Sequence, residues 1–360
     1  MLTLIADENI PHIHALAEPW GKVITYPGRH ITADTLKNAD ALLIRSVTPV
    51  TMDLLAHTSV KFVGSCTAGM DHVDVTALQQ QGIHCISAPG CNARSVAEYV
   101  LASLLTVAAQ YSIRLQGKTL AIIGYGHVGQ AVTQLMGLLD IKIIICDPPL
   151  QQQNKIQGVS LQQALTADII CLHAPLITQG PFTSHYLIGE KELKQIAPDA
   201  ILLNAGRGAL IDNEALYQHL QKNPSLHCIL DVWENEPRIH PLLAQLCRIS
   251  TPHIAGYSLD SKIKSAHQII KNMVTYFYSA AEAETIQLPN TEYADKQKIT
   301  ADLIKTFSSQ DQLYACVKQR YDLKKDHQAL QETLHLSAPE RAIAFDQLRK
   351  NYPERREFSA

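Results

Sequence analysis

The fold of this chain is decided by the stretch Thr119-Leu120-Ala121-Ile122-Ile123-Gly124-Tyr125-Gly126-His127-Val128-Gly129. An apolar run leads into three glycines, and the residues after them carry apolar side chains at helical spacing. Glycine permits a tight turn, lets the backbone approach a pyrophosphate, and allows a helix to pack closely on a strand. The pattern therefore predicts a strand, a turn and a helix whose turn contacts a dinucleotide through Gly124, Gly126, His127, Val128 and Gly129.

The acid at the end of the next apolar run strengthens this interpretation. Asp147 follows Gly129 by eighteen residues. A carboxylate at that position can accept hydrogen bonds from the adenosine ribose hydroxyls and would repel the extra phosphate of NADP. We therefore expect NAD as the cofactor. The alternative is that Asp147, which precedes two prolines, only ends its strand.

Alternating apolar runs and helical patterns extend in both directions from this stretch. Such alternation is typical of parallel sheets covered by helices. It predicts an α/β protein with two doubly wound domains: a Rossmann NAD-binding domain over residues 95–257, and a discontinuous substrate domain over residues 1–94 and 258–283. A helix from Ser95 to about Gln110 and another from Ser258 to Ala281 would join them. Residues 284–360 are richer in charge and fall outside the alternation, which predicts a third, small domain.

Three loops after apolar runs of the NAD-binding domain offer the groups that oxidation of a 2-hydroxy acid requires. They contribute Arg207 between two glycines, Glu236 before a proline, and His253 after a proline. Because parallel strands end at one edge of a sheet, these distant residues can converge there. A guanidinium binds a carboxylate, an imidazole accepts the hydroxyl proton, and a glutamate orients the imidazole. The alternatives are an interdomain salt bridge, a solvated acidic turn and a core histidine.

Composition and charge exclude several classes of protein. A net charge of -3 over 360 residues gives no strong field for nucleic acid or anionic lipid, and no apolar run is long enough to cross a membrane. The start of the chain lacks the pattern of a secretion signal, so we expect a cytoplasmic protein. The eight cysteines form no Cys-x-x-Cys pair and the sixteen histidines are scattered, which predicts reduced thiols and no metal site.

The chain resembles the D-isomer-specific 2-hydroxyacid dehydrogenase family over nearly its whole length. The motifs that carry this resemblance are Asp7-Glu8-Asn9-Ile10-Pro11, Arg45-Ser46-Val47-Thr48, Cys66-Thr67-Ala68-Gly69, Asp71-His72-Val73-Asp74, Ala88-Pro89-Gly90-Cys91-Asn92-Ala93 and Cys146-Asp147-Pro148-Pro149. Phe345 to Tyr352 and Glu354 to Glu357 resemble a subgroup that acts on phosphorylated substrates. The resemblance implies a homodimer and a small C-terminal α+β dimerisation domain.

The resemblance also implies roles for individual residues. Arg207 and Glu236 match the active-site pair of the family, and His253 matches its acid/base. The matches to substrate contacts are Ser46, Thr67 and Tyr257, and the further matches to NAD contacts are Asp147, Ala174, Asp231 and Gly256. The position of Ala174 is often threonine in the family, so its contact would come from the backbone. The substrate implied is a small phosphorylated 2-hydroxy acid, and Arg45, Ser46 and Thr67 are candidates for its phosphate.

Two questions stay open at this level. Arg349, Arg355 or Arg356 could reach the substrate phosphate, in this subunit or its partner, or could form a solvated helix face with Glu354 and Glu357. A 3-phosphoglycerate or glyoxylate dehydrogenase would share the same Arg, Glu and His. A corepressor that senses NAD and binds peptides could also keep them.

Overall fold

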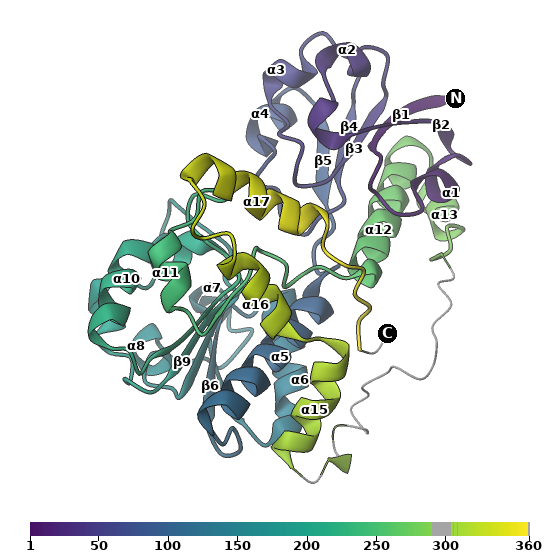
Figure 1. The fold of residues 1–360 in the computed structure, drawn as a ribbon. Coiled ribbons are helices and arrows are strands. Elements are labelled where there is room, and N and C mark those ends of the chain that lie inside the picture. Colours follow the sequence, from purple (N-terminus) through teal and green to yellow (C-terminus); the bar gives the residue numbers. More distant parts are fainter. Residues whose placement is uncertain (290–303, 305, 308, 359–360) are drawn as a thin grey trace. The chain divides into compact units, whose positions relative to one another are not determined.

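The computed structural model describes residues 1–289, 304, 306–307 and 309–358 (Figure 1). The chain divides into two compact units. Unit 1 consists of Met1–Asn92 and Ser258–Asp295, and unit 2 consists of Ala93–Tyr257 and Lys296–Ala360. The C-terminal part thus groups with the NAD-binding part, and a separate C-terminal domain stays a prediction.

Unit 1 contains a five-stranded parallel sheet in the order β2-β1-β3-β4-β5. Its strands are β1 (Leu2–Asp7), β2 (Gly21–Tyr26), β3 (Ala41–Ile44), β4 (Phe62–Ser65) and β5 (His84–Ser87). Successive residues of one strand face opposite sides: Leu4 packs against residues of α12 (Leu259–Phe277), whereas Ile5 packs in a cluster with Leu36 of α2 (Ala33–Leu36). Both faces of the sheet are therefore buried. The other helices are α1 (Ile13–Ala17), α3 (Met52–Leu55), α4 (Val75–Gln80), α13 (Ala280–Glu284) and the short η1 (Gly28–His30).

Unit 2 contains a six-stranded parallel sheet in the order β11-β10-β9-β8-β6-β7. Its strands are β6 (Thr119–Ile123), β7 (Lys142–Cys146), β8 (Ile169–Leu172), β9 (Ile201–Asn204), β10 (His227–Leu230) and β11 (Ile249–Ser250). The expected strands before the loops of Arg207, Glu236 and His253 are present as β9, β10 and β11, although β11 has only two residues. The strand order reverses between β6 and β8, which is where ligands of such sheets bind.

Helices cover both faces of this second sheet (Figure 1). The long α5 (Ala93–Tyr111) and α6 (His127–Met136) pack on one face with Leu120 and Ile122, while Ala121 and Ile123 belong to the core of the opposite face. The remaining helices of this part are α7 (Pro148–Gln152), α8 (Leu161–Ala164), α9 (Glu190–Leu193), α10 (Asn213–Lys222), α11 (Pro241–Leu246), η2 (Gly137–Leu139) and η3 (Gly208–Leu210). The helix expected from Ser95 to about Gln110 is thus present with slightly wider bounds.

The described C-terminal residues form α15 (Gln310–Arg320), α16 (Leu323–Gln331) and α17 (Ala338–Lys350). Between Gln310 and Lys350 there is no strand, which differs from the mixed α+β domain that the resemblance implied. Capping explains part of this difference, because Ser309 and Ser337 each begin a helix and Glu340 closes a capping box. Phe345 of α17 is fully buried in the hydrophobic core on one face of the six-stranded sheet, so this helix packs on unit 2.

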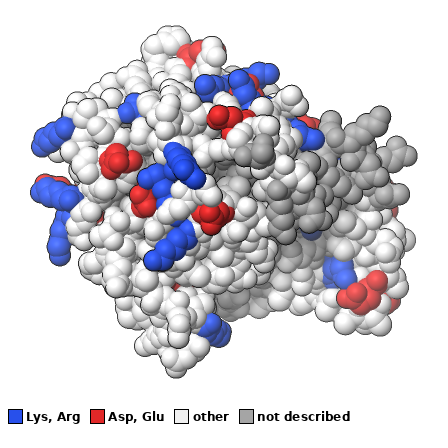
Figure 2. Space-filling model, turned by 90° about the horizontal axis from the view of Figure 1, so that it is seen from below, with Lys and Arg blue, Asp and Glu red and all other residues white. Residues whose placement is uncertain are grey.

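The cysteines, the helix lengths and the surface charges of the described residues bear on the expectations from composition. All eight cysteines are free thiols. Within the described residues, no helix is long and apolar enough to span a membrane, and no cluster of His, Cys, Asp and Glu could hold a metal ion. Among the described residues on the face drawn in Figure 2, basic and acidic side chains are interspersed and form no continuous patch of one sign.

Candidate active site

The loops that carry Arg207, Glu236 and His253 leave three neighbouring strands. β9, β10 and β11 lie side by side and run parallel, so their carboxyl ends share one edge of the sheet. Arg207 follows β9, Glu236 follows β10 and His253 follows β11. The expectation that these loops meet at one sheet edge is therefore met within unit 2.

The imidazole and the carboxylate of this group are directly paired. His253 Nδ1 lies 2.7 Å from Glu236 Oε2, and Glu236 Oε1 accepts a hydrogen bond of 2.9 Å from the Trp233 N–H. Burial acts to raise the pKa of Glu236, but His253, the Trp233 N–H and Arg349 together hold that pKa below its ordinary value. The glutamate is therefore charged at neutral pH and fixes a proton on Nδ1, which leaves Nε2 free to act as a base.

Asp231 holds the histidine loop in place. Its buried carboxylate accepts hydrogen bonds from the Thr251 hydroxyl at 2.7 Å and from the N–H groups of Ile254 and Ala255 at 2.8 and 2.9 Å. The Asp231 carbonyl also accepts the His253 N–H at 2.8 Å. These bonds keep His253 at a φ of 57°, a backbone conformation that few residues other than glycine adopt. The structure thus gives Asp231 a supporting role, and its contact with NAD stays a prediction.

The arginine loop is joined to the glutamate loop by a close backbone approach. A side chain at Gly208 would overlap the Trp233 carbonyl, which explains the glycine after Arg207. The Asn213 N–H donates to Glu234 Oε2 at 3.0 Å across the same junction. Arg207 itself is half-buried and donates from Nη1 to the Gly206 carbonyl at 2.9 Å. The two loops are therefore held in a fixed relation, as a site with two cooperating groups requires.

The glycine turn has the features of a dinucleotide cradle. Gly124 has a φ of 94°, and a Cβ there would lie 2.5 Å from the Ala174 nitrogen. By contrast, a Cβ at Gly126 would meet nothing within 4 Å, so this side of the turn has space at the start of α6. Asp147 Oδ2 accepts the Tyr125 N–H at 2.8 Å, which ties the acid to the turn. His127 and Val128 form the first turn of α6, with His127 exposed and Val128 half-buried.

A buried imidazole beside this turn has polar atoms without partners. Both ring nitrogens of His173 are buried and have no hydrogen-bond partner among the described residues. Burial lowers the pKa of this imidazole to about 4, so it is neutral at physiological pH. The backbone of its neighbour Ala174 approaches Gly124 closely, and a contact of this backbone with NAD stays a prediction. The open glycine turn, the acid and the unsatisfied imidazole all fit a bound dinucleotide.

The residues predicted to contact the substrate belong to both units. In unit 1, Ser46 and Thr67 follow the neighbouring parallel strands β3 and β4, and the Thr67 hydroxyl donates to the Gly69 carbonyl at 3.0 Å. In unit 2, Gly256 and Tyr257 complete the histidine loop, where the Tyr257 N–H donates to the Ile254 carbonyl at 2.8 Å. The Arg45 guanidinium pairs with Asp7 at 3.1 Å. All of these contacts with a substrate remain predictions.

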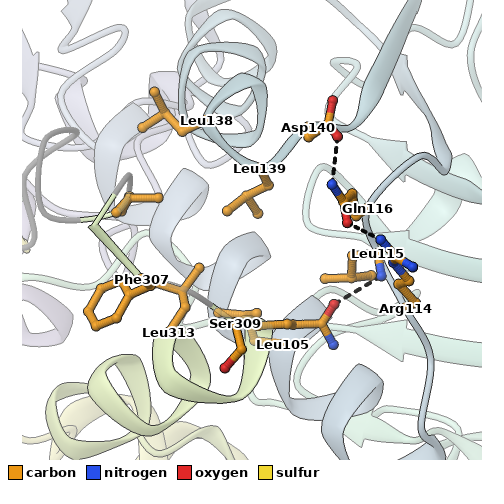
Figure 3. Close-up of a pocket in the computed structure, with 12 residues that line it drawn as sticks. Leu105, Arg114, Leu115, Gln116, Leu138, Leu139, Asp140, Phe307, Ser309 and Leu313 are labelled. Carbon is orange, nitrogen blue, oxygen red and sulfur yellow. Dashed lines mark hydrogen bonds between the residues drawn. The ribbon is translucent and has the colours of Figure 1, made fainter.

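A cavity outside this site is shown in Figure 3. It has a volume of about 550 Å³ and lies between α5, η2 and α15. Leucine side chains such as Leu139 and Leu313 line it, and none of the predicted site residues does. We therefore do not assign the reaction to this cavity.

Sequence reasoning missed the residues that support the catalytic groups. Trp233 orients Glu236 through its N–H, and its indole N–H donates to the Thr251 carbonyl at 2.9 Å. Asn204 fixes the arginine loop by accepting the Gly206 N–H and donating to the Arg207 carbonyl. Asn204 ends β9 and Trp233 lies three residues after the end of β10, and such positions do not distinguish a supporting residue from a solvated one.

Comparisons with known proteins also point to a 2-hydroxyacid dehydrogenase. Residues 98–255 match the family model described as D-isomer specific 2-hydroxyacid dehydrogenase, NAD binding domain, and residues 295–360 match a domain of unknown function. The chain is 39% identical over 358 residues to an erythronate-4-phosphate dehydrogenase of Pseudomonas syringae pv. tomato, covering 99% of this chain and 93% of that one. It is 40% identical over 363 residues to the Marinobacter nauticus protein of the same name, covering 100% and 94%.

Solved structures share the fold at lower identity. A D-lactate dehydrogenase from Aquifex aeolicus, complexed with NAD and lactic acid, superposes with a TM-score of 0.65 at 21% identity, covering 81% of this chain and 100% of that one. A 3-phosphoglycerate dehydrogenase of Entamoeba histolytica with bound NAD gives a TM-score of 0.65 at 22% identity, covering 81% and 99%. At these identities the likeness concerns the fold alone.

Proposed function

The chain belongs to the erythronate-4-phosphate dehydrogenase family of D-isomer-specific 2-hydroxyacid dehydrogenases, and on this premise we propose that it oxidises 4-phospho-D-erythronate with NAD. The product would be 3-hydroxy-2-oxo-4-phosphobutanoate, in a step of pyridoxal 5'-phosphate synthesis. The observation that carries the proposal is the 2.7 Å pair of His253 and Glu236, which lies at the same sheet edge as the Arg207 loop.

Each member of the trio has one task in this reaction. Arg207 binds the substrate carboxylate with two parallel hydrogen bonds and so fixes the C2 carbon. His253 accepts the C2 hydroxyl proton at Nε2, because its Nδ1 faces Glu236. Glu236 holds the imidazole in the productive tautomer and stabilises the imidazolium that results. Bound NAD would supply the acceptor for the C2 hydrogen, which leaves as hydride.

The residues around the glycine turn would hold the cofactor. The N–H groups at the start of α6 suit the pyrophosphate, and Asp147 suits the adenosine ribose hydroxyls. In addition, His173 offers a buried ring nitrogen without a partner in the described part of the chain. Gly256, Asp231 and Ala174 complete the set of proposed cofactor contacts. Ser46, Thr67 and Tyr257 would contact the substrate.

A comparison of three substrates tests the function. Initial rates of NADH formation with 4-phosphoerythronate, 3-phosphoglycerate and glycolate, the reduced partner of glyoxylate, would be measured on the purified protein without any peptide present. We expect the highest kcat/KM with 4-phosphoerythronate. A higher value with either other acid would move the proposal to that dehydrogenase type. Binding of NAD without turnover of any acid would favour the corepressor.

We also propose that the protein is a homodimer to which residues 284–360 contribute. On α17, Ile343 is 59% exposed although Phe345, two residues later, is fully buried. An exposed apolar residue on a helix that also packs on the core is suited to cover by a second copy. Light scattering after size-exclusion chromatography should give twice the mass of one chain, and the mass of a single chain would contradict the proposal.

A further inference from the structure

The C-terminal segment of this chain surrounds Tyr257, the last residue of the histidine loop. Arg355 Nε donates to the Tyr257 carbonyl at 3.2 Å. The rings of Tyr352 and Tyr257 meet edge to face with centroids 5.9 Å apart, and the Arg349 guanidinium carbon lies 5.9 Å from the centroid of the Tyr257 ring. Residues almost a hundred positions later in the chain therefore take part in building the region next to His253.

Arg355 and Arg356 occupy other environments. Arg355 is 8% exposed, pairs with the buried Glu98 at 2.8 Å, and lies 4.3 Å over the Tyr321 ring. It is thus committed to docking the end of the chain on α5. Arg356 lines a cavity of about 570 Å³ together with Lys318 and Asp322, and none of the catalytic trio lines that cavity.

Arg349 differs because it belongs to the electrostatic environment of the catalytic pair. Phe345 anchors α17 in the core, and Arg349, four residues later, lies on the same side of the helix. Burial acts to lower the pKa of the Arg349 guanidinium, but the Tyr257 phenol and the Glu236 carboxylate outweigh burial and raise that pKa. The interaction is mutual, since Arg349 is one of the groups that lower the pKa of Glu236.

The hydrogen bonds of Glu236 lead to groups other than this guanidinium. Its Oε1 accepts the Trp233 N–H, and its Oε2 faces His253 Nδ1. Furthermore, Arg349 Nε is buried and has no hydrogen-bond partner among the residues that the structure describes. A buried N–H of a guanidinium without an acceptor is costly, and an anion beside Tyr257 would remove that cost.

We propose that Arg349 of the C-terminal helix binds the phosphate group of the substrate and so sets the specificity of the site for phosphorylated acids. This inference rests on the proposed function. The substrate carries two anionic ends, and Arg207 can serve only one of them. A phosphate offers a charge of about -2 and three acceptor oxygens, which a planar guanidinium binds with two parallel hydrogen bonds.

Paired substrates with and without the phosphate test this assignment. The protein, Arg349→Met and Arg349→Lys would be assayed with 4-phospho-D-erythronate and with D-erythronate. For Arg349→Met we expect kcat/KM for the phosphorylated acid to fall roughly 30-fold or more, the scale for removing one partner of a hydrogen-bonded charge pair. The value for D-erythronate should stay within about threefold, since the phosphate is absent from it. Arg349→Lys should recover part of the loss, because lysine keeps the charge but not the fork.

Two controls and one alternative measurement separate a lost phosphate contact from a misfolded protein. Arg356→Met is the matched variant, an arginine of the same tail that should leave both kcat/KM values unchanged. Calorimetric titration with NAD should give the same affinity for all variants, which excludes misfolding. If D-erythronate turns over too slowly, its inhibition constant against the phosphorylated acid replaces kcat/KM.

Two results would overturn the assignment. Equal losses with both acids would mean that Arg349 only positions Tyr257 or Glu236, and an unchanged kcat/KM for the phosphorylated acid would mean that it makes no contact. Failure of the proposed function is separate, because the unmodified protein would then not prefer 4-phosphoerythronate. In that case, calorimetric binding of inorganic phosphate tests the role of Arg349 by itself. The affinity for phosphate should be about tenfold lower in Arg349→Met, because one charge-assisted contact is worth at least that factor. Equal affinity of the two proteins for phosphate would refute the inference.

Discussion

Replacing Glu236 by glutamine tests the central geometry of the site, because the substitution keeps the size of the side chain and removes its charge. In the structure one carboxylate oxygen accepts the Trp233 N–H at 2.9 Å and the other faces His253 Nδ1 at 2.7 Å. A glutamine has only one oxygen, and the Trp233 N–H requires it. The amide NH2 would then point at Nδ1, so the imidazole proton would have to move to Nε2, which is the atom that should accept the substrate proton.

The expected loss follows from two contributions. A hydrogen bond to a charged group is worth about 1.5–3 kcal/mol, which corresponds to about 10- to 150-fold in rate when the bond forms with the imidazolium of the transition state. The wrong tautomer adds to this loss, and the corresponding change in a serine protease lowers kcat about 10⁴-fold. We therefore expect Glu236→Gln to lower kcat between about 10²- and 10⁴-fold, with little change in KM.

Steady-state rates of NADH formation measure this effect. Glu214→Gln is the matched control, since Glu214 also lies beside a histidine, at 3.3 Å from His240 Nε2, but is exposed and outside the site. Its kcat should equal that of the unmodified protein. If kcat of Glu236→Gln lies within about tenfold of the unmodified value, the assigned role of the carboxylate is refuted, since tenfold is only about 1.4 kcal/mol.

Four further outcomes are expected. His253→Ala should lower kcat about 100-fold or more while calorimetry shows unchanged NAD affinity, and near-normal turnover would remove His253 as the base. Gly208→Ala should lower the free energy of unfolding by about 1–3 kcal/mol or more in urea titrations, because its Cβ would overlap the Trp233 carbonyl, whereas Gly137→Ala, which would meet nothing within 4 Å, should not. Asp147→Asn should reduce the preference for NAD over NADP in kcat/KM, and an unchanged ratio would favour a purely structural acid. Although burial acts to raise it, the pKa of Glu236 is held low by His253 and its other partners. Because this folded-state pKa is depressed, the stability that the carboxylate contributes should be complete above the ordinary glutamate value and disappear as the pH falls through the lowered one, and a difference in free energy of unfolding from Glu236→Gln that does not shrink over this range of pH would contradict the assignment.

Sequence patterns predicted most of the strands because buried parallel strands read as short apolar runs. One strand escaped. β2 (Gly21–Tyr26) is the edge strand of its sheet and is only half-buried, so it alternates less clearly. The C-terminal part was expected to mix strands and helices, yet its described elements are all helices, two of which begin at serine caps.

Some residues of the candidate site were predicted from the sequence and others were not, because only some of them depend on local geometry. Glycines and the acid of the cofactor turn are fixed by local geometry, so a short window of sequence identified them. The resemblance to the family assigned Asp231 to NAD binding but did not indicate a structural role. In the structure, its carboxylate accepts three hydrogen bonds from the histidine loop. Those partners follow it by twenty or more residues, and no local pattern reveals such a bond.

The amino-acid sequence by itself determined the class of fold, the dinucleotide turn and the identity of the Arg, Glu and His that the reaction needs. These features depend on interactions between near neighbours in the chain: the period of apolar residues, the freedom of glycine and the chemistry of single side chains. Only the tertiary structure decided which oxygen of Glu236 meets His253, why Gly208 must lack a side chain, and that Arg349 lies beside Tyr257. Such choices depend on which distant segments pack together, and packing across a sheet edge leaves no periodic signal in the sequence.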